Sequence, residues 1–171
     1  DQEIVQLSKR RAGVGVDISN IRPKGSPTKN AAKSTDGIGV FMQRFSNSIR
    51  EVGQGGRRGA LLESISIHHP EIRTFINIKK DKTKVTGANI SIKLTDEFLN
   101  AVSDGIKVQL RWPVDNRENP KIQEFVDARE LWDEIIKSAW QSAEPGLLFF
   151  DNIQKMSPAN IYGDVDDAFK E

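Results

Sequence analysis

The stretch Gln54-Gly55-Gly56-Arg57-Arg58-Gly59 combines the residue types that bind anions. Glycine lets the backbone adopt positive φ and present bare N–H groups, and arginine offers a planar set of donors that matches phosphate or carboxylate. Arg57 and Arg58 are therefore candidate anion contacts. A tight turn with two solvated arginines is the alternative, and the residue types alone favour the turn because short Gly/Arg loops are common.

Two adjacent histidines, His68 and His69, follow the β-leaning run 60–67 and are the only imidazoles in the 171 residues. Side chains of neighbouring residues point to opposite faces of a strand, so the sequence disfavours a shared metal and we predict no metal site. His69-Pro70 instead indicates the end of a strand and the entry to a helix. The sequence contains no cysteine, which excludes disulfides, thiolate metal sites and thiol catalysis within it.

Positive charge gathers in two loops. Residues 19–36 form a long irregular segment to which Arg22, Lys24 and Lys29 give a positive face, and long loops of this kind often carry function. Residues 79–88 carry Lys82 and Lys84 and have no hydrophobic period. On residue types alone a solvated loop is the favoured interpretation of the second segment, and it is the alternative for the first.

Small residues mark a third place where a ligand could approach. The run 12–18, which contains Ala12, Gly13 and Gly15, alternates small and β-branched residues and predicts a buried strand. Its two glycines leave room either for a substrate or for close packing against a helix. Both alternatives stay open from the sequence.

The overall charge is nearly balanced. The 25 basic and 24 acidic residues give a formal net charge of +1, so no global field recruits nucleic acid or an anionic membrane. No apolar run approaches the roughly 20 residues needed to span a bilayer, and the first residues lack the layout of a signal peptide. We therefore expect one soluble, cytoplasmic globular unit without nucleic-acid or membrane partners.

Hydrophobic periodicity predicts the elements that hold these candidates. One helix, 37–52, has an apolar stripe of Ile38, Phe41, Phe45, Ile49 and Val52 after a cap at 34–36, and this stripe is typical of a core or a subunit interface. A second, 122–143, is expected to bury Val126, Leu131, Trp132, Ile135, Ile136, Ala139 and Trp140. The last apolar run, 146–151, predicts a strand covered on both faces.

The predicted order is helix, strand, helix, strand, helix, strand, helix, hairpin, helix, strand, over residues 3–11, 12–18, 37–52, 60–67, 71–79, 89–94, 95–102, 105–112, 122–143 and 146–151. Such alternation predicts an α/β fold with mostly parallel strands. No internal repeat or domain boundary interrupts it.

Six short motifs occur in series: Arg11-Ala12-Gly13-Val14-Gly15, Ile21-Arg22-Pro23-Lys24-Gly25-Ser26-Pro27, Gln54-Gly55-Gly56-Arg57-Arg58-Gly59-Ala60, His69-Pro70-Glu71-Ile72, Asn89-Ile90-Ser91 and Glu144-Pro145-Gly146. In this order and spacing they resemble the catalytic subunit of ribonucleotide reductase, over essentially the whole chain. The resemblance implies a ten-stranded α/β barrel, of which residues 1–171 would be a single segment from the first half, incomplete at both ends.

The resemblance also implies roles for the loops. Residues 19–36 correspond to the family's first specificity loop, where Arg22 and Lys29, with Lys24 beside them, would contact the triphosphate of a deoxynucleotide effector. Residues 80–89 correspond to a second loop between effector and substrate, so Lys82, Lys84, Gly87 and Asn89 join Ala12 and Gly13 as expected substrate contacts. The helix 37–52 would lie at a homodimer interface.

The family's chemistry needs a thiyl-radical cysteine and two reducing cysteines, and this sequence has none. The resemblance therefore implies a split-gene product, an extein piece or an excerpt that is inactive until a complementary C-terminal part supplies them. The radical would come from adenosylcobalamin or a metal-containing subunit, neither bound by this segment. A non-catalytic nucleotide-binding or interaction module is the alternative.

Overall fold

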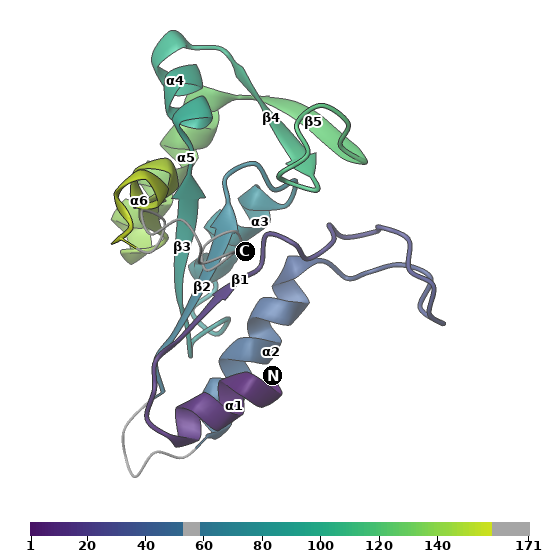
Figure 1. The fold of residues 1–171 in the computed structure, drawn as a ribbon, viewed down its shortest axis with the longest axis vertical. Helices are drawn as coiled ribbons and strands as arrows, with labels where there is room; N and C mark the ends of the chain where they lie inside the picture. Colours follow the sequence, from purple (N-terminus) through teal and green to yellow (C-terminus); the bar gives the residue numbers. More distant parts are fainter. Residues whose placement is uncertain (53–58, 159–171) are drawn as a thin grey trace.

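The computed structural model describes residues 1–52 and 59–158, in which helices and strands alternate along the chain (Figure 1). The predicted alternation is confirmed, but residues 105–112 supply only the first strand of the hairpin, and η1 and α6 are additional elements. The elements are α1 (Gln2–Lys9), β1 (Val14–Asp17), α2 (Ile38–Glu51), β2 (Leu61–Ser66), α3 (Ile72–Asn77), the 3-10 helix η1 (Ile78–Lys80), β3 (Asn89–Leu94), α4 (Asp96–Asp104), β4 (Lys107–Trp112), β5 (Ile122–Asp127), α5 (Ala128–Ser142), β6 (Gly146–Phe149) and α6 (Phe150–Met156).

The main sheet is parallel and has the order β1-β2-β3-β6, which confirms the predicted α/β class. Alternate residues such as Leu61, Ile65 and Ile92 are buried in one core with residues of the flanking helices. The other set of alternate positions is mostly small or polar, with Leu62 and Leu148 as the exceptions. Gly15, Leu62 and Asn89 lie side by side there in register across three strands.

The hairpin β4–β5 forms a separate antiparallel sheet beside the main one (Figure 1). The prediction of a helix over 122–143 is wrong in its first six residues, which pair with β4. Polar and apolar residues alternate there, and Val126 turns into the core. The helix begins only after Asp127, whose carboxylate accepts the amide of Glu130 over 2.9 Å and caps it.

Helix α5 buries fewer residues than its periodicity predicts. Leu131 and Ile135 are in the core, but Ile136 is exposed and Trp140 is 84% exposed. The helix therefore presents an apolar outer face in the described part of the chain.

Helix α2 is capped from outside its own sequence. The predicted cap at 34–36 is wrong in its position, because the N-cap is Gly37. The hydroxyl of Thr35 accepts the amide of Gly37, just before the helix, over 3.3 Å. The carboxylate of Glu71 instead accepts the amide of Ile38 over 3.0 Å. The buried side of α2 also differs from the predicted stripe, since Met42 and Ser46 lie inward while Phe41 is exposed.

The final strand is shorter and more open than predicted. β6 ends at Phe149, which is 47% exposed, so the expectation of a strand through residue 151 covered on both faces is wrong. Phe150 begins α6, and Asp151 on that helix accepts the amide of Asp96 over 2.7 Å. That contact ties the end of the chain's described part to the start of α4.

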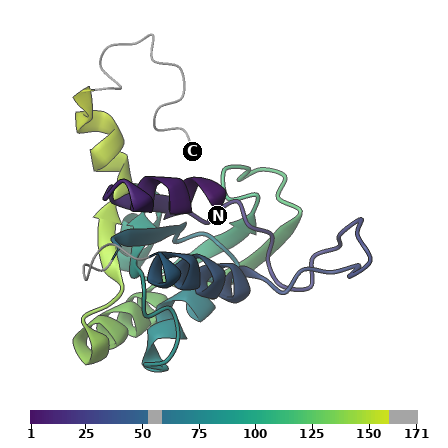
Figure 2. The ribbon, with the colours of Figure 1, turned by 90° about the horizontal axis from the view of Figure 1, so that it is seen from below.

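The loop 19–36 projects from the body of the molecule in both views (Figures 1 and 2). It contains a single bridge, between Pro27 and Ser34, in agreement with the predicted irregular segment. Among the described residues no helix is both long and apolar enough to span a membrane.

Candidate functional site

The amino ends of β1, β2 and β3 open into a cavity of about 1240 Å³, here named the strand-start cavity. Three strands begin on its wall, so backbone and side chains from distant parts of the sequence face one space. It is lined by Gly13, Val14, Gly15, Ile49, Arg50, Val52, Gly59, Ala60, Leu61, Leu62, Lys79, Thr83, Thr86, Gly87, Ala88 and Asn89.

Three of the residues expected to contact substrate, Gly13, Gly87 and Asn89, line this cavity together. A Cβ added to Gly15 would meet nothing within 4 Å, and one added to Gly13 would make only an ordinary contact with Ala60. Close packing therefore does not require glycine at either position, and their small size leaves the cavity open. Ala12 is not among the lining residues that the structure describes.

The loop 81–88 is fixed to α2 by its backbone. The amide of Val85 donates to Gln43 Oε1 over 3.0 Å, and that of Gly87 donates to Ser46 Oγ over 2.8 Å. Val85 is fully buried although the residue types favoured a solvated loop. A Cβ at position 87 would lie 2.5 Å from the Ser46 carbonyl oxygen, so only glycine fits against the helix there.

A second depression, the α2 groove, lies along the other side of that loop and has a volume of about 1010 Å³. It includes Lys24, an expected effector contact, and Lys84, an expected substrate contact. Thr83, Thr86 and Gly87 line the strand-start cavity, whereas Asp81 and Lys84 line the groove. The groove is lined by Asp1, Lys24, Asp36, Gly39, Val40, Gln43, Arg44, Asn47, Ser48, Glu51, Glu71, Thr74, Asn77, Ile78, Asp81 and Lys84. The loop is thus a shared wall between two cavities.

The remaining basic candidates lie apart from both cavities. Arg22 is exposed on the projecting loop, where its guanidinium donates to the carbonyl of Pro27 over 3.1 Å, and Lys29 is exposed further along. Lys82 lines neither cavity among the described residues and is exposed.

The candidate anion contacts Arg57 and Arg58 lie outside the described residues. Val52 and Gly59, on either side of that segment, both line the strand-start cavity.

A group of charged residues at the cavity was not found by sequence reasoning. Lys79 lines the cavity and forms an ion pair with Glu144 over 2.8 Å. Close by in the same network, Glu63 on β2 is fully buried, and neither of its carboxylate oxygens has a hydrogen-bond partner. Burial raises the pKa of Glu63 to about 8, and the charge of Lys79 opposes that rise. A glutamate inside the apolar run of β2 was the only sequence feature that could have revealed it.

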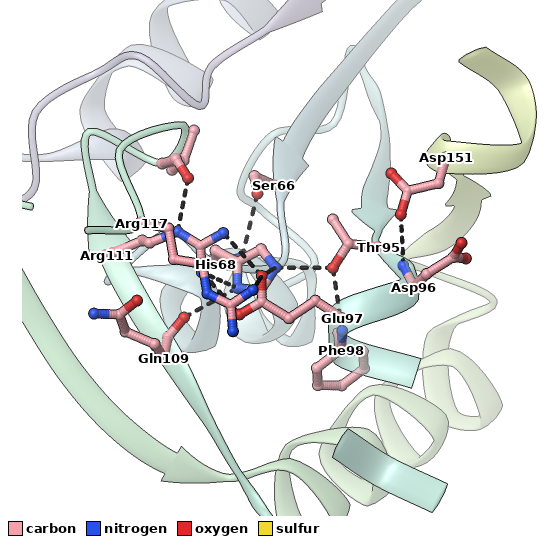
Figure 3. Close-up of polar contacts among 11 residues, drawn as sticks. Ser66, His68, Thr95, Asp96, Glu97, Phe98, Gln109, Arg111, Arg117 and Asp151 are labelled. Atoms are coloured by element: carbon pink, nitrogen blue, oxygen red, sulfur yellow. Dashed lines mark hydrogen bonds and ion pairs between the residues drawn. The ribbon is translucent and has the colours of Figure 1, made fainter. Parts of the chain in front are cut away.

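Open α/β sheets usually bind ligands at the carboxyl ends of their strands, and here the residues just after β2 are engaged in contacts with other parts of the protein. His68 Nδ1 faces the carbonyl of Gln109 at 3.0 Å, and Nε2 lies 2.8 Å from Thr95 Oγ1 (Figure 3). Arg111 donates to both carboxylate oxygens of Glu97 at 3.1 Å. Burial first, and then the charge of Arg111, lower the pKa of His68, which keeps the imidazole neutral.

Both ring nitrogens of His69 are also hydrogen-bonded within the protein. It accepts the amide of Glu71 at Nδ1 over 3.1 Å, so Nε2 carries the proton and donates to the carbonyl of Ile21 over 2.9 Å. Burial lowers the pKa of His69. The two histidines therefore anchor the β4–β5 hairpin and the projecting loop, respectively.

Comparison with known proteins places the chain in one family. The model of the ribonucleotide reductase barrel domain matches residues 1–166. A vitamin B12-dependent ribonucleoside-diphosphate reductase of Thermoplasma acidophilum is 35% identical over 162 residues, 94% of this chain and 21% of that protein. A protein of the same name from Mycobacterium tuberculosis is 29% identical over 96% of this chain and 23% of its own length.

More distant relatives include the large subunit of a ribonucleoside-diphosphate reductase from Arabidopsis thaliana, 25% identical over 96% of this chain and 23% of its own length. The chain thus spans about a fifth of the curated relatives it matches. Its parallel sheet and flanking helices are consistent with part of a barrel. With the family model matching almost the whole chain, this protein belongs to the ribonucleotide reductase family, as a portion of the barrel domain.

Proposed function

We propose that this chain is part of a catalytic polypeptide that reduces ribonucleoside diphosphates to deoxyribonucleotides for DNA synthesis. The convergence of Gly13, Gly87 and Asn89 on one cavity carries the proposal, because Gly13 lies at the start of β1 and the other two lie at the start of β3, more than 70 residues away in the sequence. The diphosphate form of the substrate rests on the names of the relatives.

The strand-start cavity is the proposed substrate side. Its glycines allow close approach of a ribose or diphosphate, and Asn89 offers both a donor and an acceptor. Arg57 and Arg58 are proposed anion contacts, since the residues flanking their segment line the same cavity. Ala12 does not line the strand-start cavity itself, and it is kept as a proposed substrate contact only because the adjacent Gly13 does line it.

The effector side is assigned to the projecting loop and the α2 groove. Lys24 lies in the groove, and Arg22 and Lys29 are exposed, so a triphosphate could reach both side chains. Lys82 and Lys84 belong to the loop 80–89, whose residues face both cavities. We assign that loop to communication between effector and substrate.

The radical chemistry belongs to residues outside this sequence. The chain has no cysteine that could become a thiyl radical, and its described residues offer no group of three His, Cys, Asp or Glu side chains to hold a metal. No radical step is therefore assigned to this chain. The names of two relatives support adenosylcobalamin, rather than a metal-containing subunit, as the radical source of the complete enzyme.

Two kinds of partner follow. A complementary part of the reductase would continue the barrel beyond the four strands of the main sheet. A second copy would pack on α2, where Val40 and Phe41 are exposed next to the groove. Both partners, and a cytoplasmic location, are part of the proposal.

A reconstitution assay tests the function. The chain is mixed with a polypeptide carrying the rest of the reductase, adenosylcobalamin, a thiol reductant, CDP and a deoxynucleoside triphosphate. Effector-dependent formation of deoxycytidine diphosphate is expected only when both polypeptides are present. A complex that binds CDP and the effector but forms no product would identify a nucleotide-binding module without catalysis and overturn the proposal.

A further inference from the structure

Asn89 is bracketed by one ion pair. The Nζ of Lys79 donates to the carbonyl of Ala88, directly before Asn89. Glu144 Oε1 accepts the amide of Ile90, directly after Asn89, over 3.1 Å. Lys79 and Glu144 are themselves joined at 2.8 Å, so both peptide groups that flank Asn89 are held by the same two side chains.

Both members of the pair are shielded from solvent. The side chain of Lys79 is 15% exposed and that of Glu144 is 21% exposed. Hydrogen bonds to charged groups are stronger than those between neutral groups, and shielding from water preserves that strength. The buried carboxyl of Glu63 adds no competing hydrogen bond, because neither of its oxygens has a partner.

The backbone of Glu144 is also fixed. Its carbonyl accepts the hydroxyl of Ser142 over 2.9 Å at the end of α5. The hydroxyl of Ser138 lies 2.9 Å from the carbonyl of Ile76 and 3.3 Å from that of Glu144, which ties α5 to α3 at the same point. Helix packing therefore sets where the carboxylate of Glu144 can be.

The side chain of Asn89 forms no hydrogen bond with the described residues. Asn89 is exposed and lines the cavity. In the sheet it lies next to Leu62, which lines the same cavity. The ion pair thus acts on the backbone of Asn89 and leaves its amide for a ligand.

We propose that Lys79 and Glu144 are positioning residues that set Asn89 in the strand-start cavity and thereby tune the affinity for the ribonucleotide. The proposal rests on the proposed function, in which Asn89 contacts the substrate. Lys79 and Glu144 act through Asn89 and do not touch the reacting atoms.

The test uses the complete reductase and measures kcat and KM for CDP with Lys79→Met, Glu144→Gln and Asn89→Ala. Each variant is expected to raise KM about tenfold, as for the loss of one charge-assisted hydrogen bond, while kcat changes less. The double variant Lys79→Met/Asn89→Ala is expected to have the same KM as Asn89→Ala alone. If Lys79 acts only through Asn89, its removal has no further effect once the Asn89 side chain is gone. Lys79→Arg, which keeps the charge and the donor, is expected to restore most of the affinity.

A matched control is the ion pair between Arg73 and Glu134, which joins α3 to α5 over 2.6 Å. It lies close in sequence to Lys79 and Glu144, which pair between η1 and the residues after α5, but it makes no contact with β3. Arg73→Met is expected to leave KM unchanged. If Asn89→Ala raises KM but Lys79→Met does not, or if their effects add fully, the positioning proposal is overturned and the substrate role of Asn89 stands. If Asn89→Ala itself has no effect on KM, the assignment of Asn89 in the proposed function fails instead.

Discussion

Glu71 caps helix α2 across 33 residues of sequence, because its carboxylate accepts the amide of Ile38 over 3.0 Å. The same oxygen accepts the amide of Lys24, also at 3.0 Å, so one side chain joins the projecting loop to the start of the helix. Gly37 permits this approach: it has a φ of 82°, and a Cβ there would lie 2.5 Å from a Glu71 oxygen.

Replacing Glu71 with alanine is expected to remove this cap. A lost N-cap costs about 1 kcal/mol, so amide exchange at Ile38 should become about fivefold faster. Hydrogen exchange followed by mass spectrometry measures this. Asp127→Ala, which removes the cap of α5, is the control and should loosen the start of α5 and not that of α2. Unchanged exchange at the start of α2 in Glu71→Ala would contradict the role of this carboxylate.

The buried carboxyl of Glu63 predicts a loss of stability with rising pH. Its pKa is raised from 4.5 to about 8, so between these values the folded chain retains a proton that the unfolded chain has released. Stability should fall across that range by up to about 1.4 kcal/mol per pH unit. Below pH 4.5 Glu63 is protonated in both states and does not change the free energy of unfolding. Above pH 8 it is ionised in both states and lowers the free energy of unfolding by a constant amount.

Glu63→Gln should remove that slope. Urea unfolding of the chain and the variant from pH 5 to 8.5 gives the difference, in which the contributions of His68 and His69 cancel. Parallel curves for the two proteins would show that Glu63 titrates normally in the folded state.

Gly87→Ala is expected to displace the loop 81–88 from α2, because the new methyl group would meet the carbonyl oxygen of Ser46. The displacement should weaken substrate binding in the complete enzyme about tenfold or more. Gly39→Ala is the matched control, since a Cβ there would make only ordinary contacts with Ile78 and Thr74 and Gly39 does not line the strand-start cavity. Equal effects of the two substitutions on KM would show that the docking of the loop is unimportant.

Arg22→Ala should weaken effector binding. An exposed guanidinium on the projecting loop can form a charge-assisted hydrogen bond with a triphosphate, worth about tenfold in affinity. Binding of dATP to the reconstituted enzyme is the measurement. Lys33→Ala removes one charge from the same loop and should have the smaller effect. Unchanged dATP affinity in Arg22→Ala would remove Arg22 from the effector site.

Substitutions in the loop 80–89 should change substrate choice more than maximal rate. We expect Lys84→Ala, in the α2 groove, and Lys82→Ala to alter the ratio of CDP to ADP reduction under each effector. Arg58→Ala is the comparison, because Val52 and Gly59, the described residues on either side of its segment, line the strand-start cavity. A change of the ratio only in Arg58→Ala would move this role from the loop 80–89 to residues 54–59.

Periodicity predicted the elements of the sheet well, because β1, β2 and β3 are short runs bounded by glycine, proline or polar residues. It failed at Ile122–Asp127, where the residues fit a helix and a strand equally and pairing with β4 decides the outcome. The sequence could not predict the cap of α2 by Glu71, since that contact depends on tertiary packing.

The candidate site was predictable only in part. Gly13, Gly87 and Asn89 were found through motif resemblance, and the structure brings them to one cavity. Lys79 and Glu144 carry no local pattern: they are 65 residues apart and meet because α3 and α5 pack together. Such pairs can be recognised only once the fold is known.

The shared wall between the strand-start cavity and the α2 groove has a thermodynamic consequence. Any ligand that binds one arrangement of the loop 81–88 more tightly than another changes the free energy of the site on the opposite side. The coupling must be equal in both directions, so an effector that improves CDP binding by some factor has its own binding improved by CDP by that same factor. Paired titrations, each performed with the other ligand saturating, would give one coupling free energy measured twice.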